Sequence, residues 1–320
     1  MRGVTGVRSA KARRARVRAL AKINLDLRVL GKRPDGFHEL RTIFQTISLG
    51  DTVEIAFTPG RETAVDLEDA AAIPDNLVVR AARMAMETMD VTGRVEMRLT
   101  KRIPMGAGLG GGSSDAAAVL LALPVLAGKV LDTARMIELG GQLGSDVPFF
   151  VLGGRAVGIG RGSELFPLPD SRASLGALVA PGIHVSTPEA YRMLSPRLTS
   201  ESLQNKMVNF QLQAWEPASG VAAANDFEAV VFEQHPHLAN LKKRLIRAGA
   251  STAMMTGSGS AVFGLFQNRT EVTRAITSLG EETTFRISLV SRARYHAMWW
   301  RALGPHIRGR EWPPRSRYLR

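Results

Sequence analysis

The densest glycine cluster of the chain is followed at once by a helix-forming run. Five glycines occur between Gly106 and Gly112, and Ser113 and Ser114 lead into the apolar run 116–123. Glycine adopts positive φ and lets a ligand approach the backbone closely. Amides at a helix start, reinforced by the helix dipole, bind anions. The stretch predicts a phosphate-binding loop, with a flexible linker as the alternative and either serine as the expected N-cap.

Three better-known glycine loops fit this stretch poorly. A P-loop needs a lysine after its glycines, and none is present. Gly106, Gly108 and Gly111 match the dinucleotide-binding spacing, yet no clear strand–helix–strand unit with a ribose-binding acid follows. The downstream motifs of protein kinases are missing. What remains resembles the phosphate loop of the GHMP kinases, which phosphorylate small molecules such as homoserine and mevalonate.

This resemblance gives the loop a role. It implies that the loop holds the phosphates of ATP, with Ser113 or Ser114 near Mg²⁺, and that the helix start at Asn76 and Leu77 lines the adenine pocket. No protein ligands for a metal follow from it. The loop residues concerned are Pro104, Met105, Gly106, Ala107, Gly108, Leu109, Gly110, Gly111, Gly112, Ser113 and Ser114.

A second match to the same family lies near the N-terminus. Residues 17–30 alternate as a strand does, and a period of two places four polar side chains on one face. These are Lys22, Asn24, Asp26 and Arg28. The glycine-bounded turn 31–36 then leads into Phe37 and His38. This resembles the GHMP branch that phosphorylates a cytidine-diphosphate-linked methylerythritol, in which a tyrosine usually stands at the position of Phe37.

The segment Gly144–Phe150 carries an aspartate between small residues and an apolar run. A Ser-Asp pair in this position is by itself an N-cap signal, so helix capping is the alternative role of Asp146. The resemblance instead places the catalytic aspartate of the branch at Asp146. A nearby lysine favours the charged form of a carboxylate. Lys22 is the lysine we expect to lie beside Asp146 and to keep it ionised.

Two blocks in the second half of the chain complete the match. Thr187 as N-cap and Pro188 in the first helical position predict a helix start, and Tyr191 lies one turn further on the same face. The resemblance implies that Tyr191 and Phe37 sandwich a cytosine base, with ordinary packing as the alternative for Tyr191. The turn Gly257–Gly259 alone predicts a hairpin. In the family such a turn packs beside the first glycine loop.

The resemblance covers roughly residues 19–290 and implies an α+β protein with the two-lobed GHMP kinase fold. The first lobe is expected to resemble domain 2 of ribosomal protein S5, with a left-handed strand–helix–strand crossover, and the second to be ferredoxin-like. Apolar alternation alone predicts only a mixed, mostly antiparallel protein. We expect an ATP-binding domain over 17–170 and a second domain over 171–292. Within them, 40–57 predicts two strands around a turn at Gly50-Asp51, and 199–220 a helix plus a variable loop.

The implied reaction is ATP-dependent phosphorylation of the 2-hydroxyl of the cytidine-diphosphate-linked methylerythritol. In it Asp146 accepts or orients the hydroxyl proton, and Lys22 stabilises the developing charge. A homoserine or mevalonate-type kinase would share the loops without the aromatic pair, and stays open as an alternative. The residues expected to contact the acceptor substrate are Asn24, Phe37, His38, Thr187, Tyr191, Gly257, Ser258 and Gly259.

The formal net charge of +13 is concentrated at the two ends of the chain. Residues 1–16 carry +6 and residues 301–320 carry +5, so the long stretch between them is nearly neutral. Basic termini can bind nucleic acid or anionic membrane, but they are also common as solvated, poorly ordered tails. We expect such extensions over 1–16 and 293–320. A nucleic-acid-binding protein is the second alternative, and the near-neutral body speaks against it.

Composition narrows the remaining classes. A chain of 320 residues with 45% hydrophobic content can bury a full core, and no apolar run reaches the roughly 18 residues of a membrane helix. The absence of cysteine excludes disulfides and thiolate metal sites, and the six histidines show no zinc-like spacing. We expect a bacterial cytoplasmic enzyme, monomeric or homodimeric. The acid-free N-terminal arm leaves a plastid transit peptide or an upstream start site as alternatives.

Overall fold

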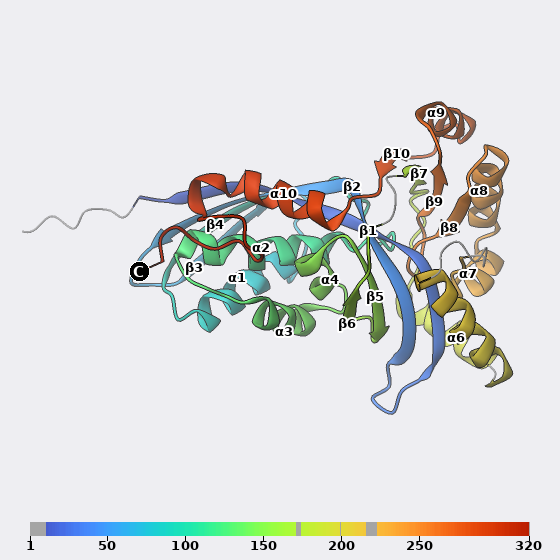
Figure 1. Ribbon diagram of the computed structural model, residues 1–320, viewed down its shortest axis with the longest axis horizontal. Coiled ribbons are helices and arrows are strands. Elements are labelled where there is room, and N and C mark those ends of the chain that lie inside the picture. The colour runs from blue at the N-terminus through green and yellow to red at the C-terminus, as the bar shows by residue number, and fades with distance from the viewer. Residues whose placement is uncertain (1–10, 171–173, 199, 216–222, 320) are drawn as a thin grey trace, which may run out of the picture.

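The chain forms two lobes connected by two long paired strands (Figure 1). The computed structural model describes residues 11–170, 174–198, 200–215 and 223–319; most of the expected N-terminal extension and the loop expected at the end of 199–220 lie outside this part. Strands β1 (Arg13–Lys32) and β2 (His38–Pro59) pair antiparallel from the far end of the first lobe to a hairpin beside the second. The two-lobed α+β prediction is confirmed.

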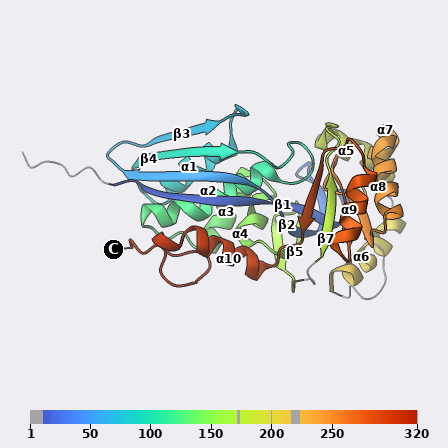
Figure 2. The ribbon, with the colours of Figure 1, turned by 90° about the horizontal axis from the view of Figure 1, so that it is seen from above.

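The first lobe is a sheet covered by helices. Its strand order is β3-β4-β2-β5-β6, with β1 paired to β2, and β3 and β4 run parallel on either side of α1 in the sequence. Helix α2 packs on the sheet, and the other three helices pack around α2 (Figure 2). The remaining elements are β3 (Ala64–Asp69), β4 (Gly93–Thr100), β5 (Arg155–Gly160), β6 (Glu164–Pro167), α1 (Leu77–Thr88), α2 (Gly111–Ala127), α3 (Thr133–Leu143) and α4 (Val147–Leu152).

The second lobe contains an antiparallel sheet of order β10-β7-β9-β8. Helices α8 and α9 pack on this sheet, and α6 lies against β1 near the long hairpin. Its elements are β7 (Leu175–Val179), α5 (Thr187–Leu194), α6 (Ser200–Trp215), α7 (Glu228–Gln234), α8 (Pro236–Arg247), β8 (Thr252–Met255), β9 (Val262–Phe266), α9 (Arg269–Ser278) and β10 (Thr284–Ser288).

An apolar cluster joins the two lobes. Ile23 and Ile47 of the long strands pack with Leu109 of the glycine loop and with Met254 and Phe263 of the second lobe. All five side chains are at least 98% buried. Within the first lobe, every side chain of α2 from residue 114 to 126 is buried, as expected for a helix that is apolar all round. The glycine loop is therefore held between a rigid helix and the junction of the lobes.

The predicted turn at Gly50-Asp51 is wrong, because β2 continues through both residues. Gly50 pairs with Leu20 of β1, and a Cβ at Gly50 would lie 2.7 Å from the Leu20 side chain. Glycine is needed here for the close approach of two strands. Asp51 is fully buried and accepts hydrogen bonds from the amides of Arg102 and Ile103.

The prediction that four polar residues share one face of β1 is half wrong. Asn24 pairs with Phe44, but Asp26 pairs with Ile43, so Leu25 is an extra residue in β1. Such a β-bulge shifts the alternation of the strand by one position. Lys22 and Asn24 consequently face the cavity described below, whereas Asp26 and Arg28 turn to the other face and form an ion pair of 2.8 Å.

Two predicted N-caps are also wrong by a few residues. Helix α2 begins at Gly111 after Gly110 in the left-handed region, and no side chain caps it. The hydroxyl of Ser114 instead donates to the carbonyl of Leu20. In α5, Ser186 is the N-cap and Thr187 is the first helical residue. Adjacent hydroxyl residues compete for the cap, and their sequence does not decide between them.

The prediction of a poorly ordered C-terminal extension is wrong. Helix α10 (Arg292–Ala302) lies along the first lobe, and the chain after it returns to the same lobe (Figures 1 and 2). Tyr295, Trp299 and Leu303, four residues apart, are each at least 99% buried. Arg13 is part of β1, inside the expected N-terminal extension, and its guanidinium lies 4.0 Å from the ring centroid of Tyr318. Both ends of the described chain are thus built into the first lobe.

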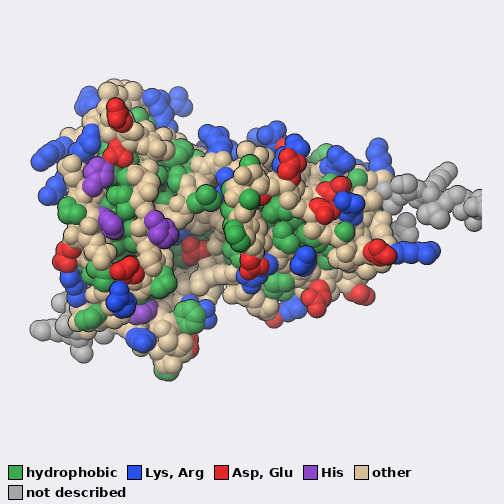
Figure 3. Space-filling model, turned by 180° about the vertical axis from the view of Figure 1, so that it is seen from behind, with side chains coloured by type: hydrophobic (Ala, Val, Ile, Leu, Met, Phe, Trp, Pro, Cys, Tyr) green, Lys and Arg blue, Asp and Glu red, His purple; other side chains and the backbone are tan. Residues whose placement is uncertain are grey.

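Charged side chains of both signs are interspersed on the surface. In Figure 3, Lys and Arg side chains occur on both lobes beside Asp and Glu. On the face shown, the described residues form no continuous basic surface. Nucleic-acid binding needs such a surface to track phosphates, so this face does not support the nucleic-acid alternative.

Candidate active site

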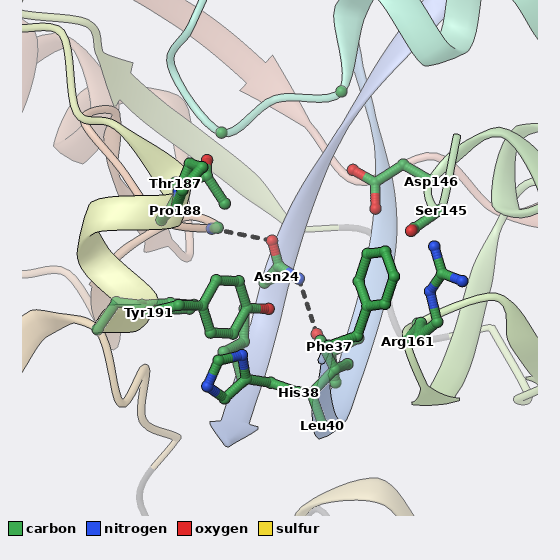
Figure 4. A pocket seen from close by; sticks show the side chains of 18 of the residues that line it. Asn24, Phe37, His38, Leu40, Ser145, Asp146, Arg161, Thr187, Pro188 and Tyr191 are labelled. Atoms are coloured by element: carbon green, nitrogen blue, oxygen red, sulfur yellow. Dashed lines mark hydrogen bonds between the residues drawn. The ribbon is translucent and has the colours of Figure 1, made fainter. Parts of the chain in front are cut away.

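A cavity of about 730 Å³ lies between the lobes and is lined by all of the predicted catalytic and acceptor-substrate residues except Gly259, and by two glycines of the predicted phosphate loop (Figure 4). Its walls come from β1, β2, the glycine loop, the segment before α4, the β5–β6 turn, α5 and the β8–β9 turn. The predicted residues that line it are Lys22, Asn24, Phe37, His38, Gly108, Gly110, Asp146, Thr187, Tyr191, Gly257 and Ser258. Segments more than 200 residues apart in the sequence therefore meet at one site.

The glycine loop has the backbone geometry of an anion-binding nest. Gly106, Gly108 and Gly110 have φ of 66°, 75° and 69°, and they alternate with the buried residues Ala107 and Leu109. Left-handed residues that alternate with residues of negative φ can turn successive amides toward one concavity. The first amides of α2 add to it, because the first turn of a helix has no intrahelical partners and no side chain caps this one.

The β8–β9 turn packs directly against this nest. A Cβ at Gly108 would lie 2.2 Å from the carbonyl oxygen of Thr256, and a Cβ at Gly257 would lie 3.1 Å from Gly108. Only glycine allows the two loops to approach this closely. Gly259 does not line the cavity, because it is buried against Met255. The predicted packing of the two glycine blocks is confirmed.

Lys22 and Asp146 meet beside the nest. Lys22 Nζ lies 3.4 Å from Asp146 Oδ2, and the lysine side chain is 4% exposed whereas that of the aspartate is 31% exposed. A Cβ at Gly110 would lie 3.3 Å from Cγ of Lys22, so the aliphatic part of the lysine side chain passes along the nest. Asp146 precedes α4 but makes no capping hydrogen bond. Its carboxylate is therefore open to the cavity and is not committed to helix capping.

Asn24 ties these groups to the second lobe. Its Oδ1 accepts from Lys22 Nζ at 2.8 Å and from the amide of Gly257 at 2.9 Å, and its Nδ2 donates to Thr42 at 2.7 Å (Figure 4). The side chain is 1% exposed, and one amide hydrogen stays available for a ligand. Its main visible effect is to fix the position of the Lys22 ammonium.

Aromatic side chains line the other end of the cavity. Tyr191 and Phe37 lie on opposite sides of it (Figure 4). His38 stacks on Tyr191 with ring centroids 4.4 Å apart, and the Arg161 guanidinium lies 3.5 Å from the Phe37 centroid. Burial, with the charge of Asp146, raises the pKa of Tyr191 to about 12. His38 covers one face of Tyr191 and Arg161 one face of Phe37, so each ring has at most one face left for a planar ligand.

The hydrogen bonds of His38 define its tautomer. Ser195 Oγ donates to the carbonyl of Tyr191 at 2.8 Å, so it accepts from His38 Nε2 at 2.8 Å. Burial, and then the charge of Lys32, lower the pKa of His38, which keeps the ring neutral at pH 7. The neutral ring carries its proton on Nε2, and Nδ1 is left as a hydrogen-bond acceptor.

A buried ion cluster supports the glycine loop from behind, and the sequence reasoning missed it. Lys101 Nζ lies 2.5 Å from Asp51 and 2.7 Å from Asp115, the residue in the second turn of α2. Burial raises the pKa of Asp115 to about 7, with Lys101 opposing and Asp51 adding to the shift. Because this pKa exceeds the ordinary value of 3.8, Asp115 makes the fold less stable as pH rises from about 4 to about 7.

Replacing Lys101 with methionine is expected to lower the free energy of unfolding by about 3–5 kcal/mol. The change leaves the carboxylates of Asp51 and Asp115 buried without their shared cation, and uncompensated buried charge costs this much. Urea denaturation followed by circular dichroism measures the difference. The matched control is methionine at Lys129, which is exposed. Equal destabilisation by both substitutions would show that the cluster contributes nothing specific.

The predicted adenine residues lie outside the main cavity. Asn76 caps α1 by accepting from the amide of Val78, and it lines a second hollow of about 520 Å³ with Asp69 and Arg80. The Leu77 side chain lies 3.9 Å from the Cβ position of Gly112, at the start of α2. An adenine site beside the nest is compatible with this position and stays a prediction.

Comparison with known proteins identifies the class. The GHMP kinases N terminal domain matches residues 76–154, and GHMP kinases C terminal matches residues 206–283. The 4-diphosphocytidyl-2-C-methyl-D-erythritol kinase of Solibacter usitatus (strain Ellin6076) is 68% identical over 310 residues, which cover 96% of this chain and 98% of that protein. This chain therefore belongs to the GHMP kinases, and the resemblance inferred from the glycine loop is confirmed.

Two further relatives carry the same enzyme name. The 4-diphosphocytidyl-2-C-methyl-D-erythritol kinase of Geobacillus thermodenitrificans (strain NG80-2) is 39% identical over 269 residues, or 83% of this chain and 93% of that protein. A crystal structure of 4-(cytidine 5'-diphospho)-2C-methyl-D-erythritol kinase matches with a TM-score of 0.72 and 34% identity, over 86% of this chain and 98% of that one.

Among the described helices, none is both long and apolar enough to span a bilayer.

Proposed function

We propose that this chain transfers the γ-phosphoryl group of ATP to the 2-hydroxyl of 4-diphosphocytidyl-2-C-methyl-D-erythritol, in the non-mevalonate route to isoprenoid precursors. One cavity carries the proposal, because it joins a glycine nest, a Lys–Asp pair and an aromatic end. The names of the bacterial relatives support the same substrate, and such an enzyme works in the bacterial cytoplasm.

The chemistry needs positioning and charge stabilisation more than covalent participation. Amides of the nest hold the triphosphate. Asp146 takes the proton from the 2-hydroxyl of the substrate. At the same time the oxygen of that hydroxyl bonds to the γ-phosphorus, and the bond between the γ-phosphorus and the leaving ADP breaks. Lys22, held by Asn24, stabilises the negative charge that gathers on the transferred group.

Mg²⁺ fits this site as a companion of ATP. Mg²⁺ usually keeps several waters and takes only one or two protein ligands beside the phosphates. The hydroxyl of Ser114 is committed to the Leu20 carbonyl, so Ser113, whose hydroxyl lies 3.8 Å from the Cβ position of Gly144, is the loop hydroxyl that would hold the ion. When bound, Mg²⁺ neutralises charge on the phosphate oxygens.

The aromatic end would select the cytosine base. Tyr191 and Phe37 supply two faces for stacking, and His38 Nδ1 accepts a hydrogen bond from an exocyclic amino group. Uracil presents a carbonyl at that position, which an acceptor repels. The cations Lys32 and Arg192 line the same region and suit the diphosphate of the substrate.

Arg161 is a site residue that sequence reasoning did not single out. Its guanidinium covers the face of Phe37 directed away from Tyr191 (Figure 4). Replacing Arg161 with alanine is expected to raise KM for the cytidylyl substrate about three- to tenfold with kcat unchanged, because a cation–π contact contributes about 1 kcal/mol. Lysine should restore less than half of the loss, since it lacks the planar stacking group.

Steady-state kinetics of ADP release checks this expectation. Alanine at Arg274, on α9 and outside the cavity, is the matched control. An unchanged KM in the Arg161 variant would remove the residue from the base-binding end.

A panel of acceptors tests the function itself. Purified protein is given Mg-ATP with the cytidylyl substrate, its uridylyl analogue, homoserine or mevalonate, and ADP release is measured. We expect kcat/KM for the cytidylyl substrate to exceed the others by at least about a thousandfold, because a site built for a polar group rejects analogues that leave it unpaired. Comparable turnover of homoserine or mevalonate would favour the sibling-kinase alternative.

A further inference from the structure

Side chains of the C-terminal segment, residues 292–319, cover the end of α4. The last carbonyls of a helix lack intrahelical partners. Here four successive carbonyls, Phe150 to Gly153, each take a side-chain hydrogen bond from this segment. The pairs are Tyr295 with Phe150 at 2.6 Å, Trp312 with Val151 at 3.2 Å, His296 with Leu152 at 3.2 Å and Arg292 with Gly153 at 3.2 Å.

These donors are packed as one unit. The rings of His296 and Trp312 stack with centroids 3.7 Å apart and an interplanar angle of 8°. Burial lowers the pKa of His296 to about 4, so the ring is neutral over the working pH range. Tyr295 is 1% exposed, and a Cβ at Gly153 would lie 2.2 Å from its ring. The segment and the end of α4 therefore fit each other closely.

The same segment reaches the end of α2. Ser316, which is fully buried, donates to the carbonyl of Val125 at 2.7 Å. Arg13, stacked on Tyr318, donates to the carbonyl of Leu126 at 2.7 Å. Two helices thus end on the C-terminal segment, and both begin at the cavity: α2 behind the glycine nest and α4 directly after Asp146.

We propose that the C-terminal segment is a brace that positions Asp146 for phosphoryl transfer by holding α4 from its far end. Helix α4 has only six residues, and so short a helix is not stable by itself. Its axis, and with it the place of Asp146 relative to Lys22, depends on its packing against α2 and α3 and on what holds its C-terminal end. Tyr295 and Trp312 are positioning residues in this sense. The proposal rests on the catalytic role proposed for Asp146.

Conservative substitutions test the brace. Tyr295→Phe and Trp312→Phe each remove one hydrogen bond to α4 and keep an aromatic ring. The control is Trp300→Phe, because Trp300 Nε1 donates to Glu311 within the segment and not to α4. We expect kcat to fall about five- to tenfold in each brace variant, with both KM values unchanged, since small displacements of a catalytic group cost up to about a hundredfold. The control should match the unaltered protein.

Amide hydrogen exchange and Asp146→Asn separate the outcomes. Exchange in residues 147–153 should accelerate in the brace variants and not in the control. Faster exchange with unchanged kcat would overturn the positioning role and leave only a structural one. Unchanged exchange would show that the bonds do not hold α4 and would also overturn it. If Asp146→Asn itself keeps normal turnover, the proposed catalytic role fails; if that variant is inactive while the brace variants are normal, only the brace fails.

Discussion

Asp146→Asn is expected to lower kcat by at least about two orders of magnitude, with little change in either KM. Asparagine keeps the shape of the side chain but cannot accept the hydroxyl proton, and loss of a general base typically costs 10²–10⁴-fold. The substitution also removes the ion pair with Lys22, whose atoms lie 3.4 Å apart. Steady-state ADP release with the cytidylyl substrate and Mg-ATP measures the effect.

A second aspartate supplies the control for this variant. Asp132 is a true N-cap that accepts from the amide of Arg135 at 2.8 Å, and asparagine caps equally well. Asp132→Asn should therefore keep full activity and stability. The thermal midpoint of Asp146→Asn should be lower than that of Asp132→Asn, because the variant leaves the buried Lys22 ammonium without its carboxylate partner, so kcat is compared at a temperature at which both variants are folded. If Asp146→Asn retained more than half of the normal kcat, Asp146 would lose its role.

Lys22→Met is expected to lower kcat by about 10²–10³-fold, the loss seen when one charge-stabilising donor is removed from an active site. Methionine fills similar space in a position where the lysine is 3% exposed, so the fold should persist. The binding of ATP should weaken less than turnover, because the nest amides remain. Single-turnover kinetics at saturating substrates separates the two effects.

Methionine at Lys243, an exposed residue of α8, is the control for general loss of positive charge. It should leave kcat and both KM values unchanged. A Lys22 variant whose kcat stays within about threefold of normal would show that the ammonium does not act on the transferred group. The nest and any Mg²⁺ would then have to supply all of the charge stabilisation.

The glycine nest is the part of the candidate site that local sequence rules predict best. Its position follows from local rules, because five glycines directly before an apolar helix favour an anion-binding turn over a flexible linker. The order of the other family-like segments along the chain predicts that Lys22, Asp146, Thr187 and Tyr191 belong to one site. All four side chains line the cavity. What the sequence could not give was the distance between Lys22 and Asp146, which lie 124 residues apart along the chain.

The failures arose where long-range packing overrides local patterns. The bulge at Leu25 reverses the faces of Asp26 and Arg28 without any glycine to mark it. Asp51 is of a residue type that is common in turns. In the structure it is buried and accepts a hydrogen bond from the amide of Ile103, 52 residues further along the chain. The spacing of Tyr295, Trp299 and Leu303 was a usable sign of a buried helix face, hidden by the arginines around it. In such a terminus, apolar residues at helical spacing are better evidence for a packed helix than a high net charge is for disorder.

A crystal structure with a non-hydrolysable ATP analogue and the cytidylyl substrate gives the most direct test of the site. We expect the phosphates of the analogue on the amides of residues 106–113, the cytosine between Tyr191 and Phe37, and the 2-hydroxyl within hydrogen-bond reach of Asp146. A triphosphate bound away from the glycine nest, or a 2-hydroxyl remote from Asp146 with both ligands in place, would contradict the mechanism.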